Sequence, residues 1–397
     1  MSIRDSTSSH KSRIQTVFNL LKDYCEAQKF KGWDPYDALN SKLLNALLLD
    51  KSRMLRLLWI QAFKRSPINL RKLFFVKKQV NPQALGLFAS GYVNAYRINR
   101  KAEDRDIVQE LCGQIVKLKS PGYSGSCWGY NFDWQARAFF QPKFSPTVVA
   151  TSFVSNGLLD AHEIIGDKSY VDEARSACEF VLNDLNRFYN DDGSYGFSYS
   201  PIDFTPVYNA TFLGARLLSR VFSITGENYL KEAALSCLQY CLKGQETDGS
   251  WPYGQKSYHN WKDSFHTGYN LECLGDIIRY CKVHEYEYNL RKGIEYYFDN
   301  FFEENGWPKY YHNNRYPADI NSVAQLIITL QKLGLIEKHR DQVNKVIEWA
   351  TNNLYNGQYF YYQKKKFATI KIPYMRWNQA WMFYALSCYL TEINEKA

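Results

Sequence analysis

The sequence predicts an all-α fold in which helical hairpins close into an (α/α)6-type toroid, with an N-terminal helical extension. Three observations lead to this prediction. A unit of turn, aromatic residues and helix recurs along the chain and is clearest over residues 245–274. Glycines in four successive loops repeat at intervals of 56, 57 and 51 residues, at Gly193, Gly249, Gly306 and Gly357. A period of this length is typical of stacked helical hairpins, and no strand-like alternation of comparable length competes with it.

Apolar periodicity, bounded by Pro, Gly, Asn and Asp, places the helices in order along the chain. Before the ring we expect helices at 14–28, from about 41, and at 52–63 and 70–80. The ring starts after Asn81-Pro82, with helices at 83–98, 103–118, 147–163, 170–186, 207–224, 229–242, 264–281, 288–302, 320–333, 339–354 and 373–390. We therefore divide the chain into an extension, residues 1–80, and a toroid, residues 81–397.

The two helices of each hairpin differ in composition. The blocks 148–159 and 207–218 align without gaps, and such first helices carry small residues, namely Ala150, Gly157, Ala210, Gly214 and Gly268. Small residues allow close approach to neighbours, as an inner ring requires, whereas the more amphipathic second helices suit an outer ring that faces water. The inner helix starts and the loops before them should then line one common mouth.

Composition narrows the range of ligands. Aromatic residues make up 16% of the chain, and ring-rich clefts bind sugars and other flat ligands, although core packing also uses such rings. The chain has 49 basic and 40 acidic residues, a net charge of +9. This excess is either a solvated basic face or a sign of an anionic partner such as an acidic polysaccharide, a nucleotide-sugar or a membrane surface. Nucleic acid is not expected, because no recognised binding motif accompanies the charge.

Cysteines and hydropathy indicate the compartment. The nine cysteines are odd in number and include no CxxC pair, which favours reduced, buried thiols. The N-terminal residues are polar and lack an apolar signal core, and no run reaches the roughly 18 apolar residues that span a bilayer. We expect a cytoplasmic protein that could associate peripherally with the inner membrane, without a metal or other cofactor.

Four residues near the expected mouth are candidates for catalysis. A histidine side chain has a reference pKa near the operating pH, so His266 suits a general acid or base, and it can equally be a structural histidine. Carboxylates at Asp133, Asp263 and Asp319 could flank a glycosidic bond, while Asp263 and Asp319 could also simply cap helices.

Further residues are candidates for substrate binding. Arg137 and Arg376 lie in aromatic sequence, where an arginine can clamp a carboxylate or stack on a ring. Asn209 and Asn321 occupy matching places in the repeat, although Asn321 could also be a cap. Rings near the mouth could stack on sugars or pack in the core, and these are Trp128, Trp134, Trp251, Trp261, Tyr310, Tyr311 and Trp377.

The segments QETDGSW (245–251) and DSFHTGYNLECL (263–274) resemble the six-hairpin toroid superfamily, which includes terpenoid cyclases, prenyltransferase β-subunits and glucuronyl C5-epimerases. The first looks like the Gln-Gly-Trp motif of the cyclases, and the second like the prenyltransferase segment whose histidine binds zinc. The other prenyltransferase ligands and the Asp-rich cyclase motif are missing here. Further segments at 32–40, 128–137, 308–311 with 317–319, and 374–381 are similar to bacterial proteins from surface-polysaccharide clusters.

These observations favour a polysaccharide-active enzyme of bacterial surface-glycan metabolism that acts on an acidic, uronate-containing sugar. Epimerisation or elimination would use a base with an arginine, and hydrolysis would use two carboxylates. One alternative is a non-catalytic glycan-binding or scaffold protein of polysaccharide assembly. Another is a terpenoid- or polyprenyl-handling enzyme.

Overall fold

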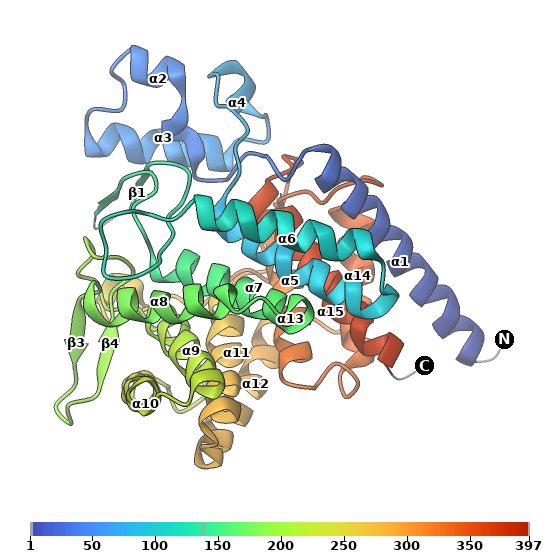
Figure 1. Cartoon of the computed structure of the whole chain (residues 1–397). Coiled ribbons are helices and arrows are strands. Elements are labelled where there is room, and N and C mark those ends of the chain that lie inside the picture. The colour runs from blue at the N-terminus through green and yellow to red at the C-terminus, as the bar shows by residue number, and fades with distance from the viewer. Residues whose placement is uncertain (1–2, 137–138, 396–397) are drawn as a thin grey trace.

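The computed structural model describes residues 3–136 and 139–395, and over this part of the chain it is mainly helical (Figure 1). Each inner helix packs against the next along the chain, and the last packs against the first. These helices are α5 (Pro82–Asn99), α7 (Val148–Ile165), α9 (Tyr208–Thr225), α11 (Ser264–Cys281), α13 (Ile320–Lys332) and α15 (Trp381–Glu395). The predicted all-α toroid is therefore confirmed.

Each inner helix is backed by an outer one. The outer helices that follow along the chain are α6 (Ala102–Lys117), α8 (Ser169–Asn183), α10 (Asn228–Leu242), α12 (Glu287–Phe301) and α14 (Arg340–Asn353). Behind α15 the outer position is taken by α1 (Ile3–Ala27), whose Phe18 ring stacks on Phe383 with centroids 4.9 Å apart. The contacts thus place α1 with the ring, although the sequence division grouped it with the extension.

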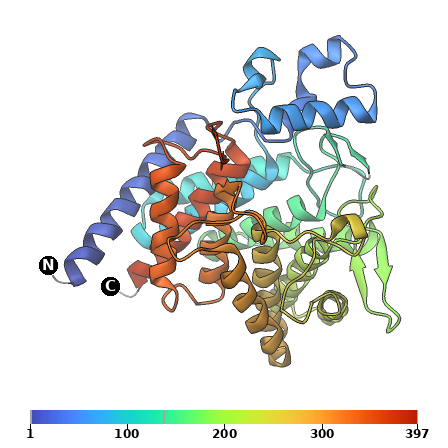
Figure 2. The same ribbon diagram turned by 180° about the vertical axis from the view of Figure 1, so that it is seen from behind.

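Residues 37–73 form a helical lobe that stands beside one end of the ring (Figures 1 and 2). The lobe consists of a 3-10 turn (Asp37–Asn40), α2 (Lys42–Ala46), α3 (Arg53–Arg65) and α4 (Leu70–Leu73). Buried Arg71 holds it together, since its Nε lies 2.6 Å from Asp37 Oδ1 and its Nη2 donates to the Asp34 carbonyl at 2.6 Å. Among the described residues, no helix has the combined length and hydropathy of a membrane span.

Short antiparallel ladders shape the loops between the helices. They are β1 (Trp134–Gln135) with β2 (Phe140–Gln141), β3 (Arg187–Tyr189) with β4 (Tyr195–Phe197), and β5 (Ala318–Asp319), β6 (Gln363–Lys364) and β7 (Thr369–Ile370) in that order. Two further 3-10 turns, Ser257–His259 and His284–Tyr286, precede α11 and α12. A π-helical turn, Met375–Ala380, leads directly into α15. These connections fix the loops that surround the inner helix starts.

Candidate active site

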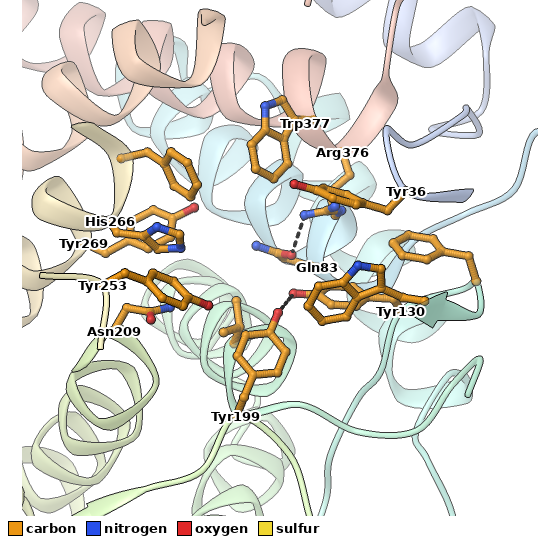
Figure 3. A pocket seen from close by; sticks show the side chains of 14 residues that line it. Tyr36, Gln83, Tyr130, Tyr199, Asn209, Tyr253, His266, Tyr269, Arg376 and Trp377 are labelled. Atoms are coloured by element: carbon orange, nitrogen blue, oxygen red, sulfur yellow. Dashed lines mark hydrogen bonds between the residues drawn. The ribbon is translucent and has the colours of Figure 1, made fainter. Parts of the chain in front are cut away.

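A pocket opens where the inner helices begin (Figure 3). Its empty volume is about 610 Å³, part of which is open to solvent. Most of the lining side chains are aromatic, and the rest are mainly polar. They are Tyr36, Gln83, Tyr130, Phe132, Trp134, Val149, Tyr199, Asn209, Tyr253, Phe265, His266, Tyr269, Arg376 and Trp377.

The ring architecture explains why residues so far apart in sequence meet here. The second residue of each inner helix from α5 to α11 lines the pocket, and these residues are Gln83, Val149, Asn209 and Phe265. Arg376 occupies the same place in the π-helical turn before α15. Helix N-termini present free backbone N–H groups and the positive end of the helix dipole. The pocket is therefore suited to electron-rich ligand groups such as hydroxyl, carbonyl and carboxylate oxygens.

Asp263 and His266 form a hydrogen-bonded pair on the first turn of α11. Asp263 Oδ1 accepts the backbone N–H of His266 at 2.9 Å and so caps the helix. Its Oδ2 lies 2.8 Å from His266 Nδ1 and 3.2 Å from the Trp261 indole nitrogen, which donates to it. Because an ionised carboxylate can only accept, this contact assigns the proton of a neutral imidazole to Nδ1 and leaves Nε2 as the free base. Figure 3 shows the His266 ring at the wall of the pocket.

Rings hold the imidazole in place. Tyr253 lies edge-on to His266 with centroids 4.8 Å apart, and Phe265 lies against it at 4.0 Å. Behind His266 a smaller cavity adjoins the pocket and is lined by Asn209, Trp251, Pro252, Tyr253, Trp261, Asp263, Thr267 and Asn270. Asp263 is 2% exposed, so it touches the histidine from the protein side rather than from the substrate side.

Arg376 lies across the pocket from His266 (Figure 3) and is paired with Asp34. Its Nε and Nη2 donate to the two Asp34 carboxylate oxygens at 2.6 and 3.0 Å, and its Nη1 donates to Gln83 Oε1 at 3.2 Å. Burial by itself would lower the pKa of the guanidinium, but the paired Asp34 and the neighbouring tyrosine hydroxyls raise it above its usual range. The bidentate pair fixes the arginine and compensates its charge inside the protein.

Two tyrosines meet at another side of the pocket. The hydroxyl oxygens of Tyr130 and Tyr199 lie 2.6 Å apart and share a hydrogen bond. Burial raises the pKa of both phenols, and that of Tyr253 as well. All three are therefore neutral at physiological pH, where they can donate a hydrogen bond or a proton but cannot act as phenolate bases.

The structure brings together about half of the residues predicted for the site. Trp134, Asn209, His266, Arg376 and Trp377 line the pocket. Three more surround the smaller cavity behind His266, namely Trp251, Trp261 and Asp263. Arg137 lies outside the described residues.

The other predicted residues lie apart from the pocket walls. Asp319 caps α13 by accepting from Asn321 N at 2.8 Å, and it also accepts from Gln363 Nε2 at 2.6 Å and from the Trp377 indole at 3.1 Å. Burial raises the pKa of Asp319 to about 6. Its oxygens are occupied by these donors, so it positions the Trp377 ring rather than facing a substrate. Asn321 is fully buried beside it.

The remaining four predicted residues make hydrogen bonds or packing contacts in the neighbouring loops. Asp133 accepts the backbone N–H of Lys143 at 2.6 Å. The Trp128 ring is fully buried and donates to the Ile115 carbonyl at 2.8 Å. Tyr310 and Tyr311 run beside the start of α11, where Asp263 and Tyr311 form a β-bridge and the Tyr310 ring meets Phe265 at 5.6 Å.

Nine pocket residues were not among those predicted. Helix register was the signal that could have found three of them, Gln83, Val149 and Phe265, because each is the second residue of an inner helix. A further residue, Tyr269, lies one turn further along α11. The other five lie in loops, where no local pattern predicts that a side chain will reach the pocket. They are Tyr36, Tyr130, Phe132, Tyr199 and Tyr253.

Within the described ranges, no three His, Cys, Asp or Glu side chains lie together as a metal site would require. No protein-family model matches the sequence, and no curated protein matches it. Solved structures do match the fold. Cellobiose 2-epimerase from Bacillus thermoamylovorans superposes with a TM-score of 0.63 at 10% identity, over 81% of this chain and 90% of that one.

Two other toroids superpose similarly. The GH76 α-mannanase from Bacteroides thetaiotaomicron gives a TM-score of 0.62 at 14% identity, over 79% of this chain and 87% of that one. An unsaturated glucuronyl hydrolase specific for heparin gives a TM-score of 0.59 at 11% identity, over 81% of this chain and 89% of that one. At these identities the likeness establishes the (α/α)6 toroid fold.

Proposed function

We propose that this protein is a carbohydrate-active enzyme that epimerises a sugar or eliminates across one of its bonds, with His266 as the general base. The observation that carries the proposal is the Asp263–His266 pair at 2.8 Å, which leaves imidazole Nε2 free at the pocket wall. The fold neighbours support the substrate class, since the names of the three given above are those of sugar-active enzymes.

The proposed chemistry begins at a sugar carbon next to a carbonyl or carboxylate. Nε2 of His266 takes the C–H proton, and the electron pair of that bond moves onto the neighbouring oxygen. Side-chain N–H groups of Gln83 and Asn209 and the tyrosine hydroxyls can stabilise the oxyanion by hydrogen bonds. In an epimerisation, the hydroxyl of Tyr130 or Tyr199 gives a proton to the opposite face of the carbon, and solvent then reprotonates the tyrosine while His266 releases its proton. In an elimination, the electron pair returns from the oxyanion to form a carbon–carbon double bond, the neighbouring C–O bond breaks, and the leaving oxygen takes the proton from Tyr130 or Tyr199.

Hydrolysis by two carboxylates receives less support. Among the described residues that line the pocket there is no Asp or Glu, whereas glycosidases need two carboxyl groups flanking the bond. The uronate predicted from the sequence stays part of the proposal, as does a role in bacterial surface-glycan metabolism. Gln83, beside Arg376, would offer its amide to the uronate carboxylate, because Asp34 already compensates the arginine charge.

Deuterium exchange detects an epimerisation, and the vinyl signals of an unsaturated sugar detect an elimination. The protein is incubated in D2O with reducing hexoses, cellobiose and uronate-containing oligosaccharides, and NMR follows deuterium at carbons next to carbonyl or carboxylate groups. We expect exchange, or formation of an unsaturated sugar, with one of these classes, and a loss of this activity by about 10²–10⁴-fold in His266→Gln. His162→Gln is the matched control, since His162 lies in the last turn of α7, far along the helix from its pocket end, and should exchange like wild type.

Two results would overturn the proposal. Cleavage of a glycosidic bond that gives a saturated product, with no deuterium at the neighbouring carbon and no new carbon–carbon double bond, would identify a hydrolase. Binding of a sugar or a polyprenyl phosphate, with neither exchange nor turnover in the wild-type protein, would instead support the scaffold or the polyprenyl alternative.

A further inference from the structure

The positive charge of this protein is concentrated in one short segment. Residues 41–80 contain ten Lys and Arg and a single acidic residue, Asp50, whereas the whole chain contains 49 basic and 40 acidic residues. The rest of the chain therefore has 39 of each sign and is neutral overall. Nearly all of the segment belongs to the helical lobe and its connection to α5, which stand beside the ring (Figures 1 and 2).

The same segment exposes many large apolar side chains. It contains seven of the eighteen strongly exposed ones among the described residues, in about a tenth of the chain. Met54 and Leu58 are 77% and 58% exposed and lie four residues apart on α3, so they share its outer face. The remaining five lie at the ends of α2 and α4, namely Leu47, Leu48, Ile68, Leu73 and Phe75. A helix face and turns that face water normally carry polar side chains instead.

Basic and apolar groups alternate on this surface. One groove is lined by Lys42, Leu43, Ala46, Arg71, Lys72, Phe75, Val76 and Lys77. The turn between β6 and β7 adds Phe367, which is 91% exposed beside Lys366, and Lys365 Nζ of this turn donates to the Arg65 carbonyl at the end of α3 at 3.0 Å. Burial, and then the nearby Arg65 and Lys64, lower the pKa of Lys365. The cations are thus crowded, and an anionic surface would relieve their repulsion.

We propose that the lobe surface, defined as residues 41–80 with the turn 365–368, docks on an anionic lipid bilayer. Apolar side chains at turn tips and on one helix face can enter the boundary between headgroups and acyl chains while Lys and Arg contact lipid phosphates. A second copy of the chain fits less well, because two such surfaces would repel each other. The inference does not depend on the proposed chemistry. Since Lys64 Nζ donates to the hydroxyl of the pocket residue Tyr36 at 2.6 Å, docking would hold the pocket close to the membrane.

Vesicle co-sedimentation of the full-length protein tests this inference. One set of vesicles is pure phosphatidylcholine, and the other contains one third phosphatidylglycerol. We expect binding to the anionic vesicles that weakens when NaCl is raised from about 0.1 to about 0.5 M. Lys72→Glu/Lys77→Glu should weaken binding to the anionic vesicles by at least about 25-fold, because each lysine near the surface contributes about a fivefold gain in affinity. Met54→Ser/Leu58→Ser should weaken it by about tenfold or more, because the apolar contact is lost.

Matched controls separate docking from general charge and folding effects. Lys338→Glu/Lys345→Glu removes the same charge from exposed sites before and on α14, and Ile224→Ser removes an exposed apolar side chain from α9. Both controls should bind like wild type, and circular dichroism should be unchanged in all variants. Lack of binding to anionic vesicles, or equal loss in controls and lobe variants, overturns the proposal. The proposal is also overturned if Met54→Ser/Leu58→Ser binds vesicles like wild type and a soluble acidic polysaccharide abolishes the binding. A dimer that forms as protein concentration rises, and that the lobe variants fail to form, would likewise overturn it.

Discussion

Two aspartates at equivalent helix positions have different tasks. Asp263 and Asp319 both cap inner helices, as either could from sequence alone. The second oxygen of Asp263 reaches the ring of His266, which faces the pocket, whereas that of Asp319 accepts from Gln363. The residue type and its helix position are thus the same in both cases. Asp263 meets a histidine three residues further on in its own helix, whereas Asp319 meets Gln363 from a distant strand, and this difference in partner decides whether the cap supports a base or packs in the interior.

Asp319 should make stability depend on pH in a defined direction. Burial raises its pKa from 3.8 to about 6, so the folded protein holds the proton more tightly than the unfolded chain. This contribution to stability is fully present below about pH 4 and is lost as pH rises through 6. Between pH 7 and pH 5, wild type should therefore gain roughly 1 kcal/mol over the non-titrating Asp319→Asn.

Urea unfolding of both proteins at the two pH values measures this gain. Asp37, whose pKa burial also raises to about 6, is present in both proteins and cancels in the comparison. A difference in unfolding free energy that stays the same at pH 7 and pH 5 would contradict the prediction.

At the scale of the elements, glycine lets two inner helices touch. A Cβ on Gly157 of α7 would lie 2.5 Å from the Gly86 carbonyl oxygen of α5, and backbone cannot yield as a flexible side chain can. Gly157→Ala should therefore cost roughly 1–3 kcal/mol of unfolding free energy by overpacking. Gly113→Ala, on the exposed side of outer helix α6, meets no atom within 4 Å and should stabilise by up to about 1 kcal/mol. Urea unfolding should show a lower unfolding free energy for Gly157→Ala and a higher one for Gly113→Ala. A lower unfolding free energy in both variants would contradict the prediction.

The inner helix starts followed from periodicity, but one feature of the last element did not. The helix expected over 373–390 begins in the structure with the π-helical turn Met375–Ala380. In this turn the Asn378 amide donates to the carbonyls of Phe360 and Ile372, and the Gln379 amide also donates to Phe360. Such a turn depends on partners from another segment, and it brings Arg376 to the pocket. The spacing of apolar residues along one helix cannot predict those partners.

At the scale of the whole molecule, α1 completes the ring and should unfold with it. Leu21 of α1 is fully buried, so Leu21→Ala should cost about 2–5 kcal/mol. The neighbouring Leu20 is 39% exposed, and Leu20→Ala should stay within about 0.5 kcal/mol of wild type. Residues 3–27 contain no tryptophan, so tryptophan fluorescence reports on the rest of the chain. In Leu21→Ala, fluorescence and circular dichroism should shift together, whereas an early loss of helicity with unchanged fluorescence would show that α1 is only an appendage.

Sequence patterns alone were enough to predict the all-α ring, the order of inner and outer helices, and the meeting of His266 and Arg376 at one mouth. These predictions follow from local periodicity and from a repeat of some 50 to 60 residues, and both can be detected in a single sequence. The folded structure was needed to show that Asp34, 342 residues away, compensates Arg376, and that Tyr130 and Tyr199 share a hydrogen bond. Contacts across a ring join segments that are distant along the chain, and no spacing rule within one segment specifies which polar atoms will meet there.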